Sequence, residues 1–165
     1  MNARVNDPHR AQRELLSGSQ FFAGLSPALL DELVAASRVL ELPANQTLFQ
    51  AGQPIREAHL LFSGSVKRST TTPGGTTKVI ELVQNEQLLG LGEIFGATHY
   101  ASTCSSITQT LLVAINIRKL REATQNHHEL SRRIIMALAR RQCATEFDIT
   151  GHHYGLTGAQ RLLDY

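Results

Sequence analysis

The feature that most constrains the fold is the sequence pattern of residues 38–117, where short segments rich in β-forming residues alternate with turn residues. These pieces read, in order, "RVLELP", "QTLFQAG", "AHLLFSGSVKRSTTT", "TKVIELV" and "TCSSITQTLLVAI". The stretch "PGGTT", Pro73 to Thr77, is a strong turn signal between two strands, because glycines accept the backbone angles of tight hairpins. Many short strands at close spacing, without a long helix between them, predict an antiparallel sandwich or barrel.

Helical patterns flank this β region on both sides. Residues 10–38 read as helical around a break at "SGSQ", and within them Ser26 is a good N-cap while Pro27 suits the first helical position. One apolar face follows at helical spacing, formed by Leu29, Leu30, Leu33 and Val34. After Asn116, "NIRKLREATQNH" predicts a short helix and residues 127–149 a long one. The sequence therefore predicts a mainly β fold with flanking helices.

The apolar residues of the long helix cover more than one of its faces. Ile135, Met136 and Phe147 widen a stripe that Leu130 and Ile134 begin. Two interpretations are open on periodicity alone: a core helix covered by its own domain, or a helix that also pairs with a second copy of the chain. The second interpretation predicts a parallel two-fold helix pair through Leu130, Ile134, Ala137, Leu138, Arg141, Ala144 and Asp148.

Composition and charge exclude several classes of protein. The chain has 165 residues, of which 42% are hydrophobic, and this suits a globular protein rather than a disordered one. The net charge of +2 is too small to predict nucleic-acid binding on its own. No apolar run approaches the roughly 20 residues of a membrane span, and the N-terminus lacks the apolar core of a signal peptide. The expected location is the cytoplasm, with no membrane partner.

The reactive side chains give no sign of catalysis. Cys104 and Cys143 have no neighbours at metal-site spacing, which excludes a structural zinc or a four-cysteine iron–sulfur cluster within the chain, and both are expected to be buried thiols. No Ser/His/Asp set, phosphate-binding loop or pair of catalytic carboxylates is present. A cupin-like metalloenzyme is the weakest alternative, because the histidines lie mostly at helix ends and turns. The chain is predicted not to be an enzyme.

The ordered set of elements resembles the Crp/Fnr family of bacterial transcription regulators over nearly the whole chain. The similarity rests on "FFAGLSPALLDELV", on "LPANQTLFQAGQPIREAHLLFSGSVKRST" with turns at Gly52 and Gly64, on "IRKLREATQNHHELSRRIIMALARRQ" and on "TGAQRLLDY". It implies an effector-sensing β-roll, a jelly-roll-like double-stranded β-helix, over residues 1–125. It further implies a dimerisation helix over 126–150, then a hinge and the start of a winged helix-turn-helix domain over 151–165.

The same resemblance implies the partners of the protein. These are a second copy in a homodimer, a small-molecule effector, RNA polymerase, and DNA bound through a C-terminal domain of which only the first turns lie in this chain. The alternative is a cyclic-nucleotide-binding regulatory domain without a DNA function.

The stretch "GLGEIFGATHYASTC", Gly90 to Cys104, corresponds to the ligand cassette of the family. In its cyclic-nucleotide binders a Gly-Glu pair precedes a short helix, and an Arg-Ser pair follows; the glutamate binds the ribose and the arginine binds the cyclic phosphate. Counting back from "LLVAI" places Tyr100 at the arginine and Ala101 at the serine. Of two alignments, we prefer the one without a gap, which leaves Leu91 instead of Glu93 at the carboxylate position.

This cassette predicts that cyclic AMP and cyclic GMP bind weakly or not at all. No arginine lies between Arg68 and Arg118. An arginine that binds a phosphate in place of the missing one has to come from a distant part of the chain, and Arg141 is the expected one. The predicted effector pocket comprises Gly90, Leu91, Gly92, Glu93, Ile94, His99, Tyr100, Ala101, Arg141 and Thr145.

The effector is expected to be less charged or differently shaped, and its identity stays open. A family branch concerned with nitrogen oxides also lacks the phosphate arginine, and this chain resembles it in "-Y-x-A/S-T-". That resemblance implies haem, with His99 as the first candidate axial ligand. The cysteine-held iron–sulfur cluster of the oxygen-sensing branch is excluded, because residues 1–38 contain no cysteine.

Overall fold

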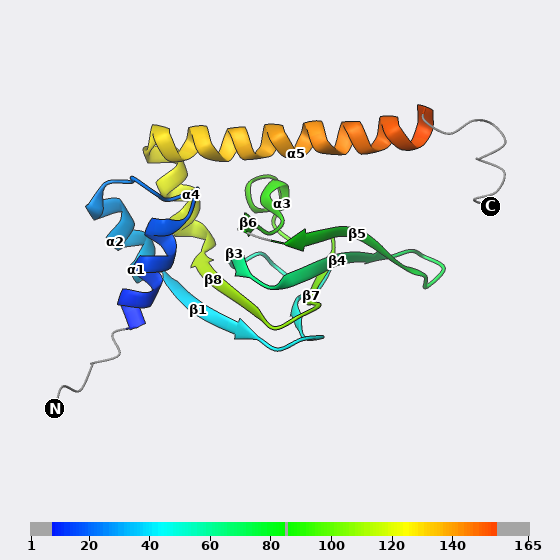
Figure 1. The fold of residues 1–165 in the computed structure, drawn as a ribbon, viewed down its shortest axis with the longest axis horizontal. Coiled ribbons are helices and arrows are strands. Elements are labelled where there is room, and N and C mark those ends of the chain that lie inside the picture. Colours follow the sequence, from blue (N-terminus) through cyan, green and yellow to red (C-terminus); the bar gives the residue numbers. More distant parts are fainter. Residues whose placement is uncertain (1–7, 85, 155–165) are drawn as a thin grey trace.

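Two four-stranded antiparallel sheets form the body of the molecule in the computed structural model, which describes residues 8–84 and 86–154, with side chains from 9 to 146 (Figure 1). The sheet orders are β1-β8-β3-β6 and β2-β7-β4-β5. The expected β-roll is thereby confirmed. The strands are β1 Ser37–Leu42, β2 Thr47–Phe49, β3 Glu57–Ser63, β4 Ser65–Thr71, β5 Thr77–Gln84, β6 Gln87–Leu88, β7 Thr103–Ser106 and β8 Thr110–Asn116.

The core of the roll is built from the inward-facing residues of β3, β4 and β8. Leu60, Leu61 and Val66 are fully buried, as are Leu112 and Ile115. The turn between β3 and β4 depends on a glycine at position 64, whose φ of 86° lies in the left-handed region. A side chain there would overlap the backbone carbonyl oxygen of Gln109, so this turn requires glycine for space as well.

Five helices accompany the sheets: α1 Pro8–Gly18, α2 Pro27–Ala35, α3 Leu91–Gly96, α4 Ile117–Asn126 and α5 His128–Tyr154. The predicted cap is confirmed, because Ser26 Oγ accepts a hydrogen bond from the Leu29 amide, and the Asn116 side chain caps α4 in the same way. α1, α2 and α4 gather at one end of the roll, while α5 runs along one side past α3 and β5 (Figure 1). Among the described residues no helix is long and apolar enough to cross a membrane.

The start of α5 packs on its own domain, which corrects the predicted dimer seam. Leu130 is 0% exposed and Ile134 is 3% exposed, and both belong to the core of the roll. The large apolar side chains that the described part of α5 leaves exposed are the neighbours Ile135, at 64%, and Met136, at 42%. The own-domain interpretation therefore holds for the stripe at Leu130 and Ile134, because a helix with two apolar faces buries one of them against its own sheet.

The remaining residues of the predicted seam have different surroundings. Ala137 and Leu138 are partly buried against the core, and Ala144 is exposed. Arg141 pairs with Glu81 of β5. The Asp148 side chain lies outside the described residues, as does the predicted start of a DNA-binding domain after residue 154.

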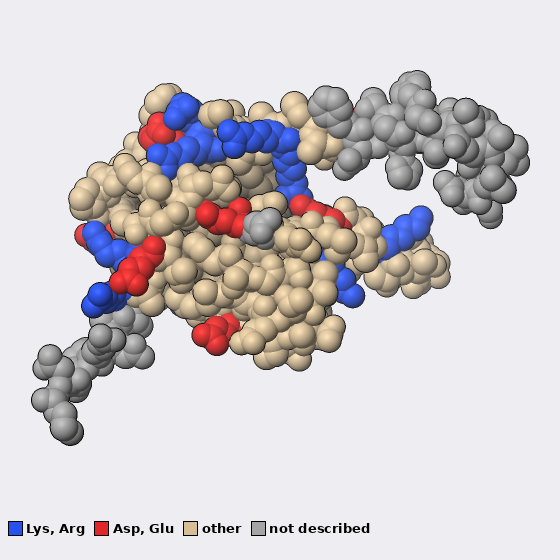
Figure 2. Space-filling model, viewed as in Figure 1, with Lys and Arg blue, Asp and Glu red and all other residues tan. Residues whose placement is uncertain are grey.

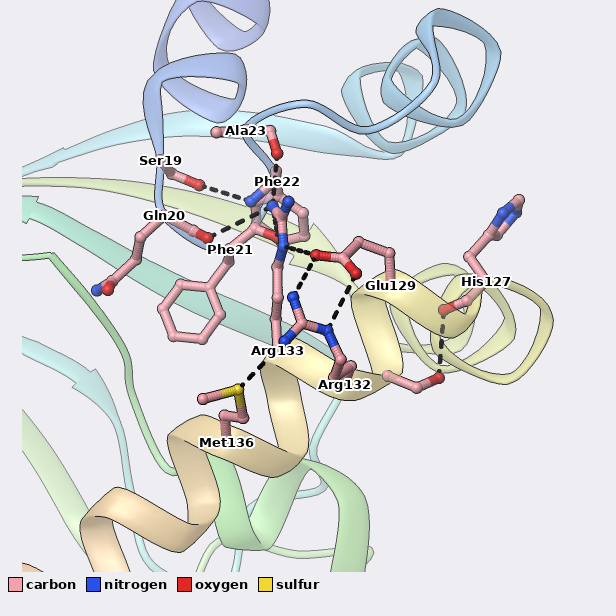
Figure 3. Close-up of polar contacts among 11 residues, drawn as sticks. Ser19, Gln20, Phe21, Phe22, Ala23, His127, Glu129, Arg132, Arg133 and Met136 are labelled. Carbon is pink, nitrogen blue, oxygen red and sulfur yellow. Dashed lines mark hydrogen bonds and ion pairs between the residues drawn. The ribbon is translucent and has the colours of Figure 1, made fainter.

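One arginine of α5, Arg133, attaches the helix to the loop that follows α1. Basic side chains gather along α5 (Figure 2), and Figure 3 shows Arg133 pointing into that loop. Its Nη1 donates to the backbone carbonyl oxygens of Phe21 at 3.2 Å and Ala23 at 2.5 Å, while its Nε donates to Glu129 at 2.9 Å. Hydrogen bonds from Arg132 and Arg133 hold the pKa of Glu129 at about 2, well below its usual range. Arg133 thus joins α5 to a loop more than a hundred residues earlier in the chain.

Replacing Arg133 with methionine should destabilise the domain by about 1–3 kcal/mol, because loop carbonyl groups lose charge-assisted hydrogen bonds. Arg132 is the matched control: it is more than half exposed, bonds to the same Glu129, and makes no bond to the loop. Its replacement by methionine should cost no more than about 0.5 kcal/mol. Urea unfolding of both variants measures the difference. Equal losses would contradict the anchoring role of Arg133.

A buried histidine links the two sheets. The His59 ring, on β3, is 6% exposed and stacks on Phe49 of β2 with ring centroids 5.8 Å apart. Burial lowers its pKa from 6.5 to about 4; Glu57 opposes this shift and Arg38 adds to it. His59 is therefore neutral in the folded protein at neutral pH, and an unfolded chain binds the proton at higher pH than the folded one.

Acidification should destabilise the domain through His59. Since the folded pKa is the lower one, the contribution of His59 is fully present above pH 6.5 and is lost as the pH falls toward about 4. The slope is at most about 1.4 kcal/mol per pH unit. Urea unfolding of the wild type and His59→Gln across this range measures it, since the variant should lose stability less steeply. Identical slopes in both proteins would contradict a buried neutral His59.

Candidate functional site

A cavity of about 730 Å³ separates α5 from the roll. One wall is the face of α5 from Arg132 to Thr145, and the opposite wall comes from β4, β5, β6, the start of α3 and the loop after α1. Its size suits a small-molecule ligand, for which pockets span roughly 300–1,000 Å³. The lining residues are Gln20, Phe21, Arg68, Ile80, Glu81, Gln87, Leu88, Leu91, Arg132, Arg133, Met136, Ala137, Arg140, Arg141, Ala144 and Thr145.

An arginine that the sequence analysis did not select lies at the inner end of this cavity. The Arg68 side chain, on β4, is only 7% exposed. Its Nε and Nη2 donate to Ser102 Oγ at 3.0 and 2.7 Å, its Nη1 donates to Glu81 at 3.1 Å, and its Nη2 also pairs with Glu93. A buried guanidinium needs such partners, because an unpaired charge in a protein interior is strongly destabilising.

Strand register explains how Arg68 meets Glu81. The two residues lie directly opposite each other in the antiparallel β4–β5 pair, and the register shifts immediately after them, which leaves Ile80 as the extra residue. Opposite residues in such a pair project on the same face, so the two side chains meet. The bulge also re-aims β5 at this point. Alternation along β4 carries the same information: Val66 and Arg68 are buried, and Lys67 between them is exposed.

A chain of alternating charges crosses the cavity from α3 to α5. Glu93 pairs with Arg68, Arg68 pairs with Glu81, and Glu81 pairs with Arg141 of α5. The second carboxylate oxygen of Glu93, Oε2, is buried without a hydrogen-bond partner. Gly90, in the left-handed region at φ 63°, is the N-cap of α3, and a side chain there would approach that oxygen to 3.1 Å. The ion pairs thus connect the long helix, the sheet and the short helix.

The predicted pocket residues divide between this cavity and other places. Leu91, Arg141 and Thr145 line the cavity. Leu91 is a buried core residue, and the carboxylate that pairs with Arg68 belongs to Glu93. Ile94 is also a core residue and Gly92 is exposed.

The second half of the cassette turns away from the cavity. The Tyr100 ring packs face to face on Phe49, with centroids 3.8 Å apart, and its hydroxyl donates to the Glu57 carbonyl oxygen at 2.9 Å. Burial raises the pKa of Tyr100. Ala101 and His99 are exposed, and His99 bonds to the Thr98 hydroxyl in a separate surface depression. None of the three lines the cavity, although Ser102 of the same segment bonds to Arg68 in its lining.

The donor atoms at the cavity do not fit the expected haem. Among the described residues its lining contains neither histidine nor cysteine, and the one thioether there belongs to Met136, which is 42% exposed. Among the described residues no cluster of histidine, cysteine, aspartate and glutamate is arranged to hold a metal ion. His99 therefore gains no support as an axial ligand at this site.

The two cysteines differ in their surroundings, which corrects the expectation that both are buried. Cys104 lies in the core, and burial raises its pKa to about 12, so it is an unreactive thiol. Cys143 is exposed on α5 and lies outside the lining of the cavity.

The roll with its ion-paired cavity matches a known family. Residues 39–127, more than half of the chain, match the description of the cyclic nucleotide-binding domain. The chain belongs to the cyclic nucleotide-binding domain family. Tyr100, Ala101 and His99 are not among the residues that line the cavity.

Transcription regulators are prominent among the proteins to which this domain is similar. The CRP-like cAMP-activated global transcriptional regulator of Mycobacterium tuberculosis is 25% identical over 128 residues, which are 78% of this chain and 57% of that protein. The chain therefore spans a little over half the length of this curated relative. Such relatives are regulators and not enzymes, in agreement with the prediction that this chain is not an enzyme.

Solved structures share the fold. The sensor domain of the transcriptional regulator DNR from Pseudomonas aeruginosa superposes with a TM-score of 0.68 at 23% identity, covering 90% of this chain and 97% of that one. The catabolite activator protein of Thermus thermophilus gives a TM-score of 0.64 at 19% identity, covering 78% of this chain and 61% of that one. At these identities the likeness extends to the fold alone.

Proposed function

We propose that the chain is the effector-sensing and dimerisation part of a Crp/Fnr-type DNA-binding transcription regulator that acts in the cytoplasm. The observation that carries this proposal is the position of the cavity, which α5 closes on one side and the sheets close on the other. A molecule in the cavity touches both walls, so its binding energy depends on where α5 lies. A ligand shifts a conformational equilibrium only if it binds one state more tightly than the other. A ligand that contacts both walls would have different affinities for two positions of α5.

The exposed apolar side chains support a second copy of the chain as a partner. Ile135 and Met136 are exposed on α5, and β5, which is an edge strand of its sheet, exposes Val79, Ile80 and Leu82. Large apolar side chains exposed on these two elements favour an interaction site. We therefore move the proposed dimer seam by one position along α5, from Ile134 to Ile135.

Cyclic AMP should bind weakly, with a dissociation constant in the millimolar range or above. The reason differs from the one that the sequence suggested, because an arginine is present in the pocket. A cyclic phosphate would have to displace a carboxylate from Arg68, which bonds to Ser102, Glu81 and Glu93, and the loop at Tyr100 and Ala101 offers no second cation to hold it. Titration calorimetry with cyclic AMP is the direct measurement. A low-micromolar dissociation constant that disappears in Glu93→Gln would contradict this prediction.

The proposed function is tested on the regulator with its DNA-binding domain attached. A small-molecule library is screened for compounds that raise the melting temperature of the 165-residue chain, and each hit is added to an operator-binding assay. A sensor predicts hits that change the affinity for DNA. Hits that stabilise the chain and leave DNA affinity unchanged would favour the alternative, a ligand-binding regulatory domain without a DNA function.

A further inference from the structure

The cavity has a surplus of positive charge. Five arginines line it, Arg68 from the sheet and four from α5, and the carboxylates paired with them are Glu81, Glu93 and Glu129. Among the residues whose side chains the structure describes, five guanidinium groups against three paired carboxylates leave a surplus of two positive charges. Figure 2 shows basic side chains concentrated on α5, with acidic ones beneath it. Such a concentration in a recess attracts anions.

Two of the carboxylates, those of Glu81 and Glu93, are the anions that pair with the buried Arg68. Arg68 is 7% exposed, while Glu81 and Glu93 are 19% and 17% exposed, so this part of the network is largely removed from water. Glu81 bonds to Arg68 and also to Arg141 across the cavity. An anion that reached these two guanidinium groups would replace one anion by another, and the displaced Glu81 carboxylate would regain contact with water.

Most of the uncharged lining residues are apolar. Phe21, Leu88 and Leu91 contribute from the roll, and Met136 and Ala137 from α5. An inorganic anion would leave these surfaces in contact with water, whereas a ligand with an apolar body would cover them.

We propose that the effector is a small organic anion, with a carboxylate or phosphate head on an apolar body, whose head replaces Glu81 between Arg68 and Arg141. The proposal rests on the function proposed above and names the ligand class of the same site. It assigns the anion-binding role to Arg68 on β4 and Arg141 on α5, and not to the segment after α3. When the head of the ligand displaces the Glu81 carboxylate, α5 loses its bond to Glu81 and contacts the ligand instead. Ligand binding would be transmitted to the helix in this way.

Phenyl phosphate and benzoate serve as probes, and benzyl alcohol and benzamide as their uncharged counterparts. Each is titrated into the isotopically labelled 165-residue chain, and amide shifts in β5 and α5 give the dissociation constant. Both anions should bind at least about tenfold more tightly than the uncharged compounds. Added salt should weaken the anions alone.

Three variants assign the role to residues. Arg141→Gln should weaken both anions at least about tenfold, because it removes a charged donor. Arg118→Gln, which makes the same charge change on exposed α4, should leave their affinity within about twofold. Glu81→Gln should tighten both anions by about tenfold, because the competing carboxylate has lost its charge. A merely structural role of Glu81 would weaken them.

Equal binding of charged and uncharged probes would overturn the proposal, as would failure of both anions to bind at millimolar concentrations or an unchanged affinity in Arg141→Gln. Cyclic AMP is titrated in the same way. If it binds more tightly than phenyl phosphate, and equally well to the wild type and to Arg141→Gln, the site is a cyclic-nucleotide site and the proposal is wrong. These outcomes concern the charge of the ligand. A regulator whose DNA binding responds to an uncharged effector would overturn this inference and leave the proposed function standing.

Discussion

Replacing Ile134 with aspartate is expected to unfold the domain, whereas the same replacement at the neighbouring Ile135 should leave it folded. Ile134 is 3% exposed in the core, and Ile135 is 64% exposed on the other side of α5. An unpaired carboxylate at the first position costs on the order of 3–5 kcal/mol, a large part of the stability of a small domain. At the second position the cost to the folded chain should stay within about 0.5 kcal/mol.

Urea unfolding and sedimentation separate the two effects. Ile134→Asp should lower the unfolding midpoint sharply, while Ile135→Asp should keep the midpoint and abolish dimer formation. A chain with Ile134→Asp that stays as stable as the wild type and only loses its dimer would show that the face at Ile134 is the seam after all.

Replacing Arg68 with methionine should cost about 3–5 kcal/mol, because Glu81 and Glu93 are left without their shared cation in a largely buried place. Lys67→Met is the matched control, since this neighbouring cation is exposed on the opposite face of β4. It should change the free energy of unfolding by no more than about 0.5 kcal/mol.

Replacing the two carboxylates that lose Arg68 with amides should restore much of the stability that Arg68→Met loses. We expect the triple variant Arg68→Met, Glu81→Gln, Glu93→Gln to be clearly more stable than Arg68→Met alone, because amides are less costly than charges to leave unpaired. Equal stability of Arg68→Met and Lys67→Met in denaturant titrations would mean that the network contributes little and that Arg68 does not organise the cavity.

Local signals were sufficient to predict the fold. The turn at Pro73–Thr77 joins β4 to β5, and the caps at Ser26 and Asn116 begin α2 and α4 as their side chains dictate. These features depend on residues within a few positions of each other, so they can be read from one sequence.

The candidate site depends on pairings between distant segments, and the sequence analysis missed its centre for that reason. Arg68 meets Glu81 through strand register and Glu93 through the packing of α3, at separations of 13 and 25 residues. The alternation of Val66, Lys67 and Arg68 was the one available signal, because it places an arginine at an inward position of a strand. Counting residues back from β8 could not reveal that Tyr100 turns into the core.

Periodicity could not decide which side of α5 faces its own domain. Ile134 and Ile135 are adjacent and equally apolar, and they lie about 100° apart around the helix. Contacts with distant segments, such as the bonds from Arg133 to the loop after α1, fix the rotation of α5, so that one isoleucine is buried and the other exposed.

Hydrogen exchange along α5 tests most directly whether the cavity is a sensor. The amides of residues 130–146 are followed with and without a compound that raises the melting temperature of the chain. Our account predicts slower exchange in α5 and in the β4–β5 pair together, because one occupant contacts both walls of the cavity. A ligand that protects β4 and β5 and leaves exchange in α5 unchanged would contradict it.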